Sequence, residues 1–408
     1  MTERDIGQKL DMRRIFWAMG ASTRIDVKLS ALVPRATSKG RSTSEEWTDL
    51  DVLAVEYTPL AGLTLAVADC KTLRGRVTER VFWLRGVADL FGARAAYLTR
   101  EEALPPSSRQ LALRLGLTAL DPVDRHQLVE DLPEARLPIA GTFLTGEAFG
   151  RWQALLADTP KAIEHLERFR RTGYWIVPRH RNLTYVVSQL RAARVSFIPA
   201  QRWALAMLAD LAWLYLLAML AALDDMIRLH LADPAAGLRQ VVVGTEQEAR
   251  EKERLGQQLT RLFAALPTRS DEVPPVELLP PYFEDLADLF GRLSRRRSEA
   301  TDALRVLEFF GTETVAARGV AWADAFPGAG PFAPKLASDV IRFLVSSAGL
   351  HADFVALFDR QLGSPPGPGA VGIVTAEGVS GSGASEEQQH LFGTTAEQVK
   401  PARQREGA

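Results

Sequence analysis

Residues 63–71 have the sequence LTLAVADCK, a largely apolar run that ends in Asp69, Cys70 and Lys71. Such a run predicts a central β-strand that is covered on both of its faces. Because side chains at positions i and i+2 of a strand share a face, Asp69 and Lys71 are expected to project together and Cys70 to the opposite face. The strand therefore presents a carboxylate and an ammonium group side by side at its end.

A second apolar run lies just upstream, and it contains its own acid, Asp51. The residues between the two runs, Pro59 to Gly62, favour a turn, which predicts an antiparallel hairpin. In such a hairpin Asp51 lies on the strand adjacent to Asp69. Asp49 shares the strand face of Asp51. It is either a further ligand of a metal ion or a solvated residue where the strand begins.

These acids predict a site for a divalent cation. Mg²⁺ takes oxygen ligands and uses one or two carboxylates together with waters and a substrate phosphate. Asp51 and Asp69 supply the carboxylates, and the backbone carbonyl of Cys70 is a further candidate ligand. Bound Mg²⁺ or Mn²⁺ lowers the pKa of a water ligand and stabilises charge on a phosphate, and the compact ammonium of Lys71 suits a place beside the reacting groups. The alternative is that Asp69 and Lys71 form only an ion pair at the end of a strand.

The order of elements around these residues resembles that of the PD-(D/E)XK nuclease superfamily, whose restriction-endonuclease-like fold runs helix, three strands, helix, strand. The resemblance covers the N-terminal third of the chain and assigns the family's two metal-binding acids to Asp51 and Asp69 and its lysine to Lys71. Two features depart from the family pattern: no Pro precedes Asp51, and the first helix has no inward Glu, for which Asp11 is a poor substitute. The matching elements are predicted, in chain order, at residues 8–19, 23–32, 50–57, 63–68, 78–91 and 93–98.

The resemblance implies a metal-dependent hydrolase that cuts phosphodiester bonds, with DNA as the expected substrate and Mg²⁺ or Mn²⁺ as the cofactor. It also implies, by analogy only, a role in defence against foreign DNA and a homodimer as the working form. Two other functions stay open. One is a catalytically inactive nuclease fold that binds nucleic acid, and the other is a helical scaffold or membrane-associated interaction protein.

Arginines gather just after the predicted site, and four of them are candidates for contacts with nucleic-acid phosphates: Arg74, Arg76, Arg80 and Arg85. The same cluster also fits a solvated helix face. The chain as a whole has a net charge of −1, so no global field draws it to a polyanion. A second basic cluster at residues 292–297 is interpreted first as a solvated helix face, with binding of nucleic acid or a partner as the alternative.

The rest of the chain predicts helices and a tail. The 408 residues, 47% of them hydrophobic, are enough for a large core. Pro133 and Pro138 mark a domain boundary. We therefore expect a nuclease-like α/β domain over residues 1–132, a mainly α-helical domain of unknown role over residues 139–362, and a disordered tail rich in Gly, Pro, Ser and Glu over residues 363–408.

Trp203–Leu223 is apolar and long enough to span a bilayer, apart from Asp210. The preferred interpretation is a helix surrounded by other helices, since no neighbouring segment shares its hydrophobicity; a membrane span is the alternative. The single cysteine excludes an intrachain disulfide and a cysteine-rich zinc site. No secretory signal is recognised, so the cytoplasm is the expected location.

Overall fold

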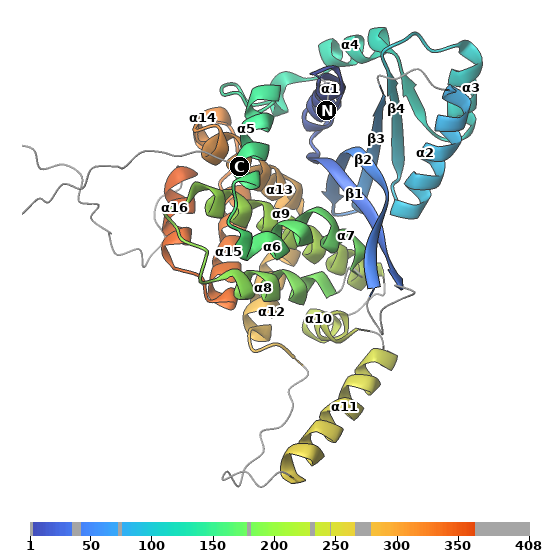
Figure 1. Ribbon diagram of the computed structural model, residues 1–408. Coiled ribbons are helices and arrows are strands. Elements are labelled where there is room, and N and C mark those ends of the chain that lie inside the picture. Colours follow the sequence, from blue (N-terminus) through green and yellow to red (C-terminus); the bar gives the residue numbers. More distant parts are fainter. Residues whose placement is uncertain are drawn as a thin grey trace, which may run out of the picture. The chain divides into compact units, whose positions relative to one another are not determined.

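The N-terminal part of the chain forms a mixed β-sheet with helices packed against it (Figure 1). The computed structural model describes residues 3–34, 42–71, 76–177, 181–228, 233–244, 246–265 and 279–363. This α/β region is the architecture that the sequence predicts for the first part of the chain. Its elements are α1 (Glu3–Met19), β1 (Ser22–Pro34), β2 (Ser42–Thr58), β3 (Gly62–Lys71), α2 (Val77–Phe91), β4 (Ala95–Arg100), α3 (Pro106–Arg114), β5 (Thr118–Leu120) and α4 (Pro122–Asp131).

The strands lie in the order β1-β2-β3-β4-β5 across the sheet. The first three pair in antiparallel fashion, with Val52 of β2 opposite Ala68 of β3, which confirms the predicted hairpin. Gly62 completes its turn at a φ of +70°, a left-handed conformation that glycine adopts without steric cost. The pairs β3–β4 and β4–β5 are parallel, and α2 makes the crossover that a parallel β3–β4 pair requires.

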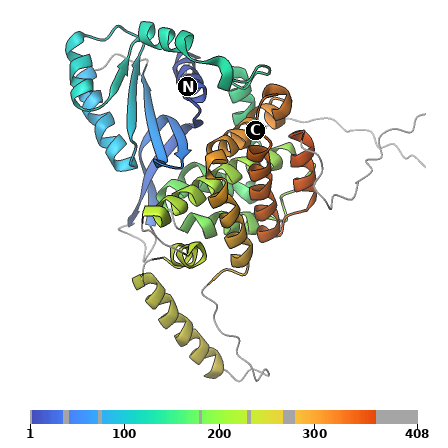
Figure 2. The same cartoon turned by 180° about the vertical axis from the view of Figure 1, so that it is seen from behind.

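Both faces of the central strands are covered, as the apolar pattern of β2 and β3 predicts. Leu65 and Val67 of β3 belong to a large hydrophobic cluster that also includes residues of α2. Ala68 and Cys70 belong to a smaller cluster, in which Met12 and other residues of α1 take part. In both ribbon views α1 and α2 accordingly lie on opposite faces of the sheet (Figures 1 and 2).

After α4 the described chain is helical, as the sequence predicts. Two stretches have the wider π-helical geometry, at Phe169–Gly173 and Phe310–Ala316. The α-helices are α5 (Gly146–Ala157), α6 (Glu164–Arg168), α7 (Tyr174–Ile176), α8 (Asn182–Ala193), α9 (Arg202–Arg228), α10 (Pro234–Val243), α11 (Glu246–Ala265), α12 (Phe283–Arg295), α13 (Ala300–Phe309), α14 (Trp322–Ala325), α15 (Phe332–Ala348) and α16 (Asp353–Gln361).

The apolar segment Trp203–Leu223 lies within α9, which is buried among the other helices. By length and composition α9 could cross a membrane, but 94% of its most apolar window is buried inside the protein. Its internal acid, Asp210, accepts hydrogen bonds from Arg24 (2.9 and 3.0 Å) and from Arg170 (3.3 Å). These partners explain how an acid is tolerated in an apolar helix, because a buried charge requires a partner. The cellular location stays a prediction.

One nearly buried carboxylate joins the sheet region to the helices. Glu308 of α13 accepts hydrogen bonds from Arg13 (2.9 and 3.1 Å) and Trp17 (3.0 Å) of α1. It also accepts from Ser22 (2.8 Å) and from the backbone N–H of Thr23 (2.7 Å) at the start of β1. Because charge-assisted hydrogen bonds are stronger than neutral ones, this carboxylate holds the first helix and the first strand against α13.

The sheet and the helices belong to one compact unit, Met1–Gly367. Besides Glu308, Thr301 of α13 bonds both the backbone N–H (2.8 Å) and the carbonyl (3.1 Å) of Tyr57 in β2. The division into domains at residues 1–132 and 139–362 stays a prediction. The predicted tail, apart from Gly363, lies outside the described residues.

Replacing Glu308 should destabilise the protein strongly. Glu308→Gln leaves the buried Arg13 guanidinium without its counter-charge, and breaking a buried pair in this way costs about 3 kcal/mol of unfolding free energy. Urea unfolding followed by circular dichroism measures the change. Glu164→Gln is the matched control, because Glu164 pairs with Arg168 on the surface and such pairs are worth less than about 1 kcal/mol. An equal, small effect of both variants would contradict the role given to Glu308.

The ion pairs of Asp210 with Arg24 and Arg170 should make the free energy of unfolding depend on pH in the acid range. Burial would raise the pKa of Asp210, but the charges of Arg24 and Arg170 lower it below the ordinary value of 3.8. The stabilisation is therefore present above that value and is lost as the pH falls through the lower folded-state pKa. Asp210→Asn should be less stable than the wild type at about pH 7, and the difference should shrink toward about pH 2. Urea midpoints over this pH range test it; a difference that grows on acidification would contradict it.

Candidate metal centre

Asp51 lies in β2, where it is only 3% exposed. Its Oδ2 accepts a hydrogen bond from the backbone N–H of Cys70 in β3 (2.7 Å). Its Oδ1 lies 2.8 Å from the Nζ of Lys9, a residue of α1. The carboxylate is thus held from two sides, by the backbone of the neighbouring strand and by the first helix.

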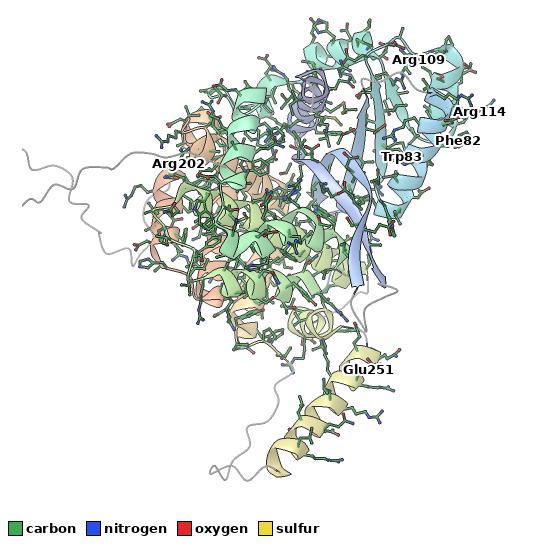
Figure 3. The ribbon with its side chains drawn as sticks, in the orientation of Figure 1. Phe82, Trp83, Arg109, Arg114, Arg202 and Glu251 are labelled. Carbon is green, nitrogen blue, oxygen red and sulfur yellow. The ribbon has the colours of Figure 1, made fainter. Side chains whose placement is uncertain are left out.

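Asp69 lies on the adjacent strand, and it is equally buried. Continuing the β2–β3 register by one pair beyond Val52 and Ala68 places Asp69 opposite Asp51. Both carboxylate oxygens of Asp69 accept hydrogen bonds from the guanidinium of Arg80 in α2, one of them 2.6 Å from Nε. The guanidinium also lies over the ring of Trp83 (3.4 Å to the centroid); Trp83 is labelled on α2 in Figure 3. Arg80 therefore orients Asp69 in a bidentate pair, and its own position is fixed by the aromatic ring.

Two further acids approach Asp51. Carboxylate oxygens of Asp26, Asp49 and Asp51 lie within 4.8 Å of one another, the one such group among the described residues. Asp26 stands opposite Asp51 in β1, between the pairs of Ile25 and Val27 with β2. Its φ is +59°, a left-handed conformation that is uncommon for residues other than glycine and that Asp tolerates. Such local strain concentrates at functional sites.

Lys9 lies between two of these acids. Its ammonium is 2.5 Å from Asp26 and 2.8 Å from Asp51. Burial alone would lower the pKa of Lys9, but the charges of Asp51 and Asp26 outweigh it and raise the pKa above its ordinary value. The amine is therefore protonated at neutral pH, and it compensates part of the negative charge of the acidic group.

The donor set fits a hard cation. Three carboxylates within 4.8 Å supply the oxygen ligands that Mg²⁺, Mn²⁺ or Ca²⁺ take. Asp69 is not a member of this group, and its oxygens bond Arg80. Among the described residues, Asp51, Asp26 and Asp49 are therefore the group whose spacing suits a shared metal ion. The sequence instead predicts Asp51 and Asp69 as the metal ligands.

Cys70 and Lys71 complete the predicted site. The Cys70 thiol packs in the α1-side cluster, and burial, with the nearby charge of Asp51, raises its pKa. The sulfur is therefore a neutral thiol, and only the backbone carbonyl stays a candidate ligand. The backbone of Lys71 ends β3 beside Arg100 of β4, whereas its side chain lies outside the described residues.

The predicted phosphate-binding arginines have acidic partners wherever the structure describes them. Arg76 pairs with Glu79 (3.0 Å), Arg85 pairs with Asp89, and Arg80 pairs with Asp69. Arg74 lies outside the described residues. Arg76 directly precedes α2 and Arg85 lies in it. Both pairs are on the surface, where they are weak and open to exchange, so contact of these two arginines with phosphate stays a prediction.

Two residues of this centre are not evident in the sequence. Asp26 leaves a faint signal, since it is an acid between the apolar residues Ile25 and Val27 of a predicted strand. Lys9 leaves none, because a lysine in an amphipathic helix is ordinarily solvated. Asp11, the substitute ligand considered from the sequence, instead pairs with Arg125 (2.9 Å).

A comparison with protein-family models, with curated proteins and with solved structures found no match.

Removing Lys9 should make stability depend on metal ions. Lys9→Met leaves Asp26 and Asp51 without their ammonium, so the variant should melt at a lower temperature than the wild type in EDTA. A divalent cation bound by the three acids would replace the lost charge, so Mn²⁺ should raise the melting temperature of the variant more than that of the wild type. Lys28→Met is the control, because Lys28 pairs with the exposed Glu46 of β2 (2.6 Å). A Mn²⁺ shift that is equal in all three proteins would contradict the site.

Proposed function

We propose that this protein is a metal-dependent nuclease that hydrolyses phosphodiester bonds in DNA, with its catalytic centre around Asp51 and Asp69. One observation carries the proposal. Asp26, Asp49 and Asp51 bring carboxylate oxygens within 4.8 Å of one another, at a position where Asp69 and Lys71 lie on the next strand. Clustered carboxylates that bind a divalent cation are the means by which many nucleases act on phosphate.

The order of the elements supports the same proposal. The chain runs α1, β1, β2, β3, α2, β4, which is the helix, three strands, helix and strand of the PD-(D/E)XK nucleases. Asp51 lies on the second strand and Asp69 and Lys71 on the third, the strands to which the resemblance assigns the family's two acids and its lysine. The restriction-endonuclease-like fold is thus part of the proposal, as is the role in defence against foreign DNA, which rests on analogy alone.

Each residue has a distinct task in this proposal. Asp51, with Asp26 and Asp49, would hold Mg²⁺ or Mn²⁺, and the backbone N–H of Cys70 keeps Asp51 in place. Bound metal would supply Lewis acidity toward a phosphate and a water of lowered pKa.

The two basic residues next to the acids would act on the substrate and on Asp69. Lys71 would stabilise the charge that develops on the phosphate. Arg80 holds Asp69 in a bidentate pair, so that this carboxylate keeps one orientation. A guanidinium in such a fork is better suited to orienting a carboxylate than a lysine would be.

One observation favours the alternative of a fold that binds nucleic acid without cutting. Asp51 is already paired with Lys9 (2.8 Å), and Asp69 with Arg80 (2.6 Å). Cations supplied by the protein therefore already neutralise both predicted metal ligands. A divalent cation would have to displace or stand beside the Lys9 ammonium, and if it cannot do so the centre is structural.

A cleavage assay distinguishes the two functions. We expect the wild type to cut DNA with Mg²⁺ or Mn²⁺ and to lose this activity in EDTA. Asp51→Asn, Asp69→Asn and Lys71→Ala should each reduce the rate by at least ~100-fold, the scale expected for groups that act directly in proton transfer and charge stabilisation. Asp11→Asn is the matched control, since Asp11 is an acid of α1 outside the acidic group. Linear, circular and single-stranded DNA and RNA are compared as substrates.

Equal rates for the wild type and the three site variants would reject the site assignment. Absence of cutting by the wild type on every substrate, together with binding of DNA at low salt, would favour the inactive nucleic-acid-binding fold. Absence of both cutting and binding would favour the helical scaffold, because phosphate contacts are strongest at low salt.

A further inference from the structure

A basic groove lies between the C-terminal end of α12 and the first turns of α15. It has a volume of about 250 Å³, and four of its six lining residues are cationic: Arg292, Arg295, Arg296, Lys335, Leu336 and Asp339. The chain as a whole has a net charge of −1. The positive charge is therefore a local feature of this surface, and the general composition of the protein does not account for it.

Three of the four cations of the groove have no ion-pair partner within the part of the chain that the structure describes. The single acid of the groove, Asp339, is engaged by Arg292 (3.3 Å), which also pairs with Asp288 on its own helix (2.6 Å). Arg295, Arg296 and Lys335 form no ion pair with any of the described residues. Three positive charges at one groove repel one another, and an anion bound there would relieve that repulsion.

The helix that forms the second wall adds to this preference. The positive end of a helix dipole lies at its N-terminus, and α15 is 17 residues long with no side-chain cap at Pro331. Lys335 lies in the first turns of α15, where an acidic residue would be the favourable choice. The dipole of α15 and the cations of the groove therefore attract the same kind of ligand.

An exposed aromatic ring stands beside the cations. Phe332, the first residue of α15, is 47% exposed, and the Arg296 guanidinium lies over its ring (4.3 Å to the centroid). Proteins that bind single-stranded nucleic acid combine these two features, since bases stack on aromatic rings while cations contact the phosphates. A small free anion would use the charges and leave the ring without a role.

We propose that this groove binds single-stranded DNA, with phosphates on Arg295, Arg296 and Lys335 and a base stacked on Phe332. The choice of DNA as the polyanion rests on the proposed nuclease function, whereas the charge and the aromatic ring do not. The groove is a second contact for the substrate, formed by α12 and α15 and by no residue of the candidate metal centre. It gives the helical part of the chain a function of its own in holding the strand that is to be cut.

The test is binding of fluorescein-labelled oligothymidylate to the full chain, followed by fluorescence anisotropy in EDTA, where no metal-dependent cleavage occurs. The triple variant Arg295→Ala, Arg296→Ala, Lys335→Ala should bind at least ~10-fold more weakly, and its slope of log K against log salt should fall by about 2 because three phosphate contacts are lost. Phe332→Ala should weaken binding by ~10-fold with the slope unchanged. Arg342→Ala is the control, since Arg342 is an exposed residue of α15 that pairs with Asp359 (3.5 Å); it should bind as the wild type does.

Several outcomes would overturn the proposal: no binding by the wild type at low salt, equal affinity of the triple variant, or an equal loss in Arg342→Ala. Displacement of the oligonucleotide by inorganic phosphate at the same molar concentration would indicate a small-anion site. Binding to phosphatidylserine vesicles, lost in the triple variant and without oligonucleotide binding, would indicate a membrane surface. Circular dichroism melting checks that the variants fold, and Lys335→Ala alone serves if the triple variant does not.

Failure of this proposal and failure of the nuclease function can be told apart. Asp69→Asn should lose cutting and keep oligonucleotide binding, whereas the triple variant should bind the oligonucleotide at least ~10-fold more weakly. A wild type that binds through the groove and cuts no substrate would reject the nuclease and keep the groove. If the wild type cuts DNA and the triple variant binds with unchanged affinity, the nuclease function is supported and the groove is rejected.

Discussion

The nearly buried carboxylate of Glu308 is the constraint on which the rest of the arrangement depends. It accepts hydrogen bonds from Arg13 and Trp17 of α1 and from the first residues of β1, so one acid of α13 sets the position of the N-terminal helix against the sheet. Lys9 lies about one turn before Arg13 in α1. The contact of Lys9 with Asp51 therefore depends on a residue almost three hundred positions away. Through this link the helical part of the chain takes part in forming the candidate centre.

The candidate centre follows from a single electrostatic requirement. Carboxylates that are nearly inaccessible to water need positive partners, and each of the two central acids has one, Lys9 for Asp51 and Arg80 for Asp69. If the proposed metal site binds a divalent cation, that cation would compete with the Lys9 ammonium for the same carboxylate oxygens. In the basic groove between α12 and α15 the charges are positive instead, and three of them, on Arg295, Arg296 and Lys335, have no acidic partner among the described residues. In the two proposals, the acidic centre would bind a cation and the basic groove an anion.

The sheet could be predicted largely from local pattern. The apolar runs in β2 and β3 and the turn residues between them predict an antiparallel hairpin covered on both faces, and the structure confirms it. The partners of the acids could not be predicted in this way. Lys9 meets Asp51 across 42 positions of sequence, and Arg24 meets Asp210 across 186. The residue pattern within either segment does not predict these contacts, because the position of a helix relative to a sheet is set by packing.

The sequence by itself determined where the strands and helices form, which faces of them are apolar, and that acids stand on adjacent strands at one place. These properties depend on side-chain period and on turn chemistry, which are local. Only the tertiary structure decided which charges meet: that Asp26 and Asp49 join Asp51, that Arg80 binds Asp69, and that Arg295 and Lys335 share a groove. A charged group is stabilised by whatever lies within a few ångströms of it in space, and that neighbourhood exists only once the chain has folded.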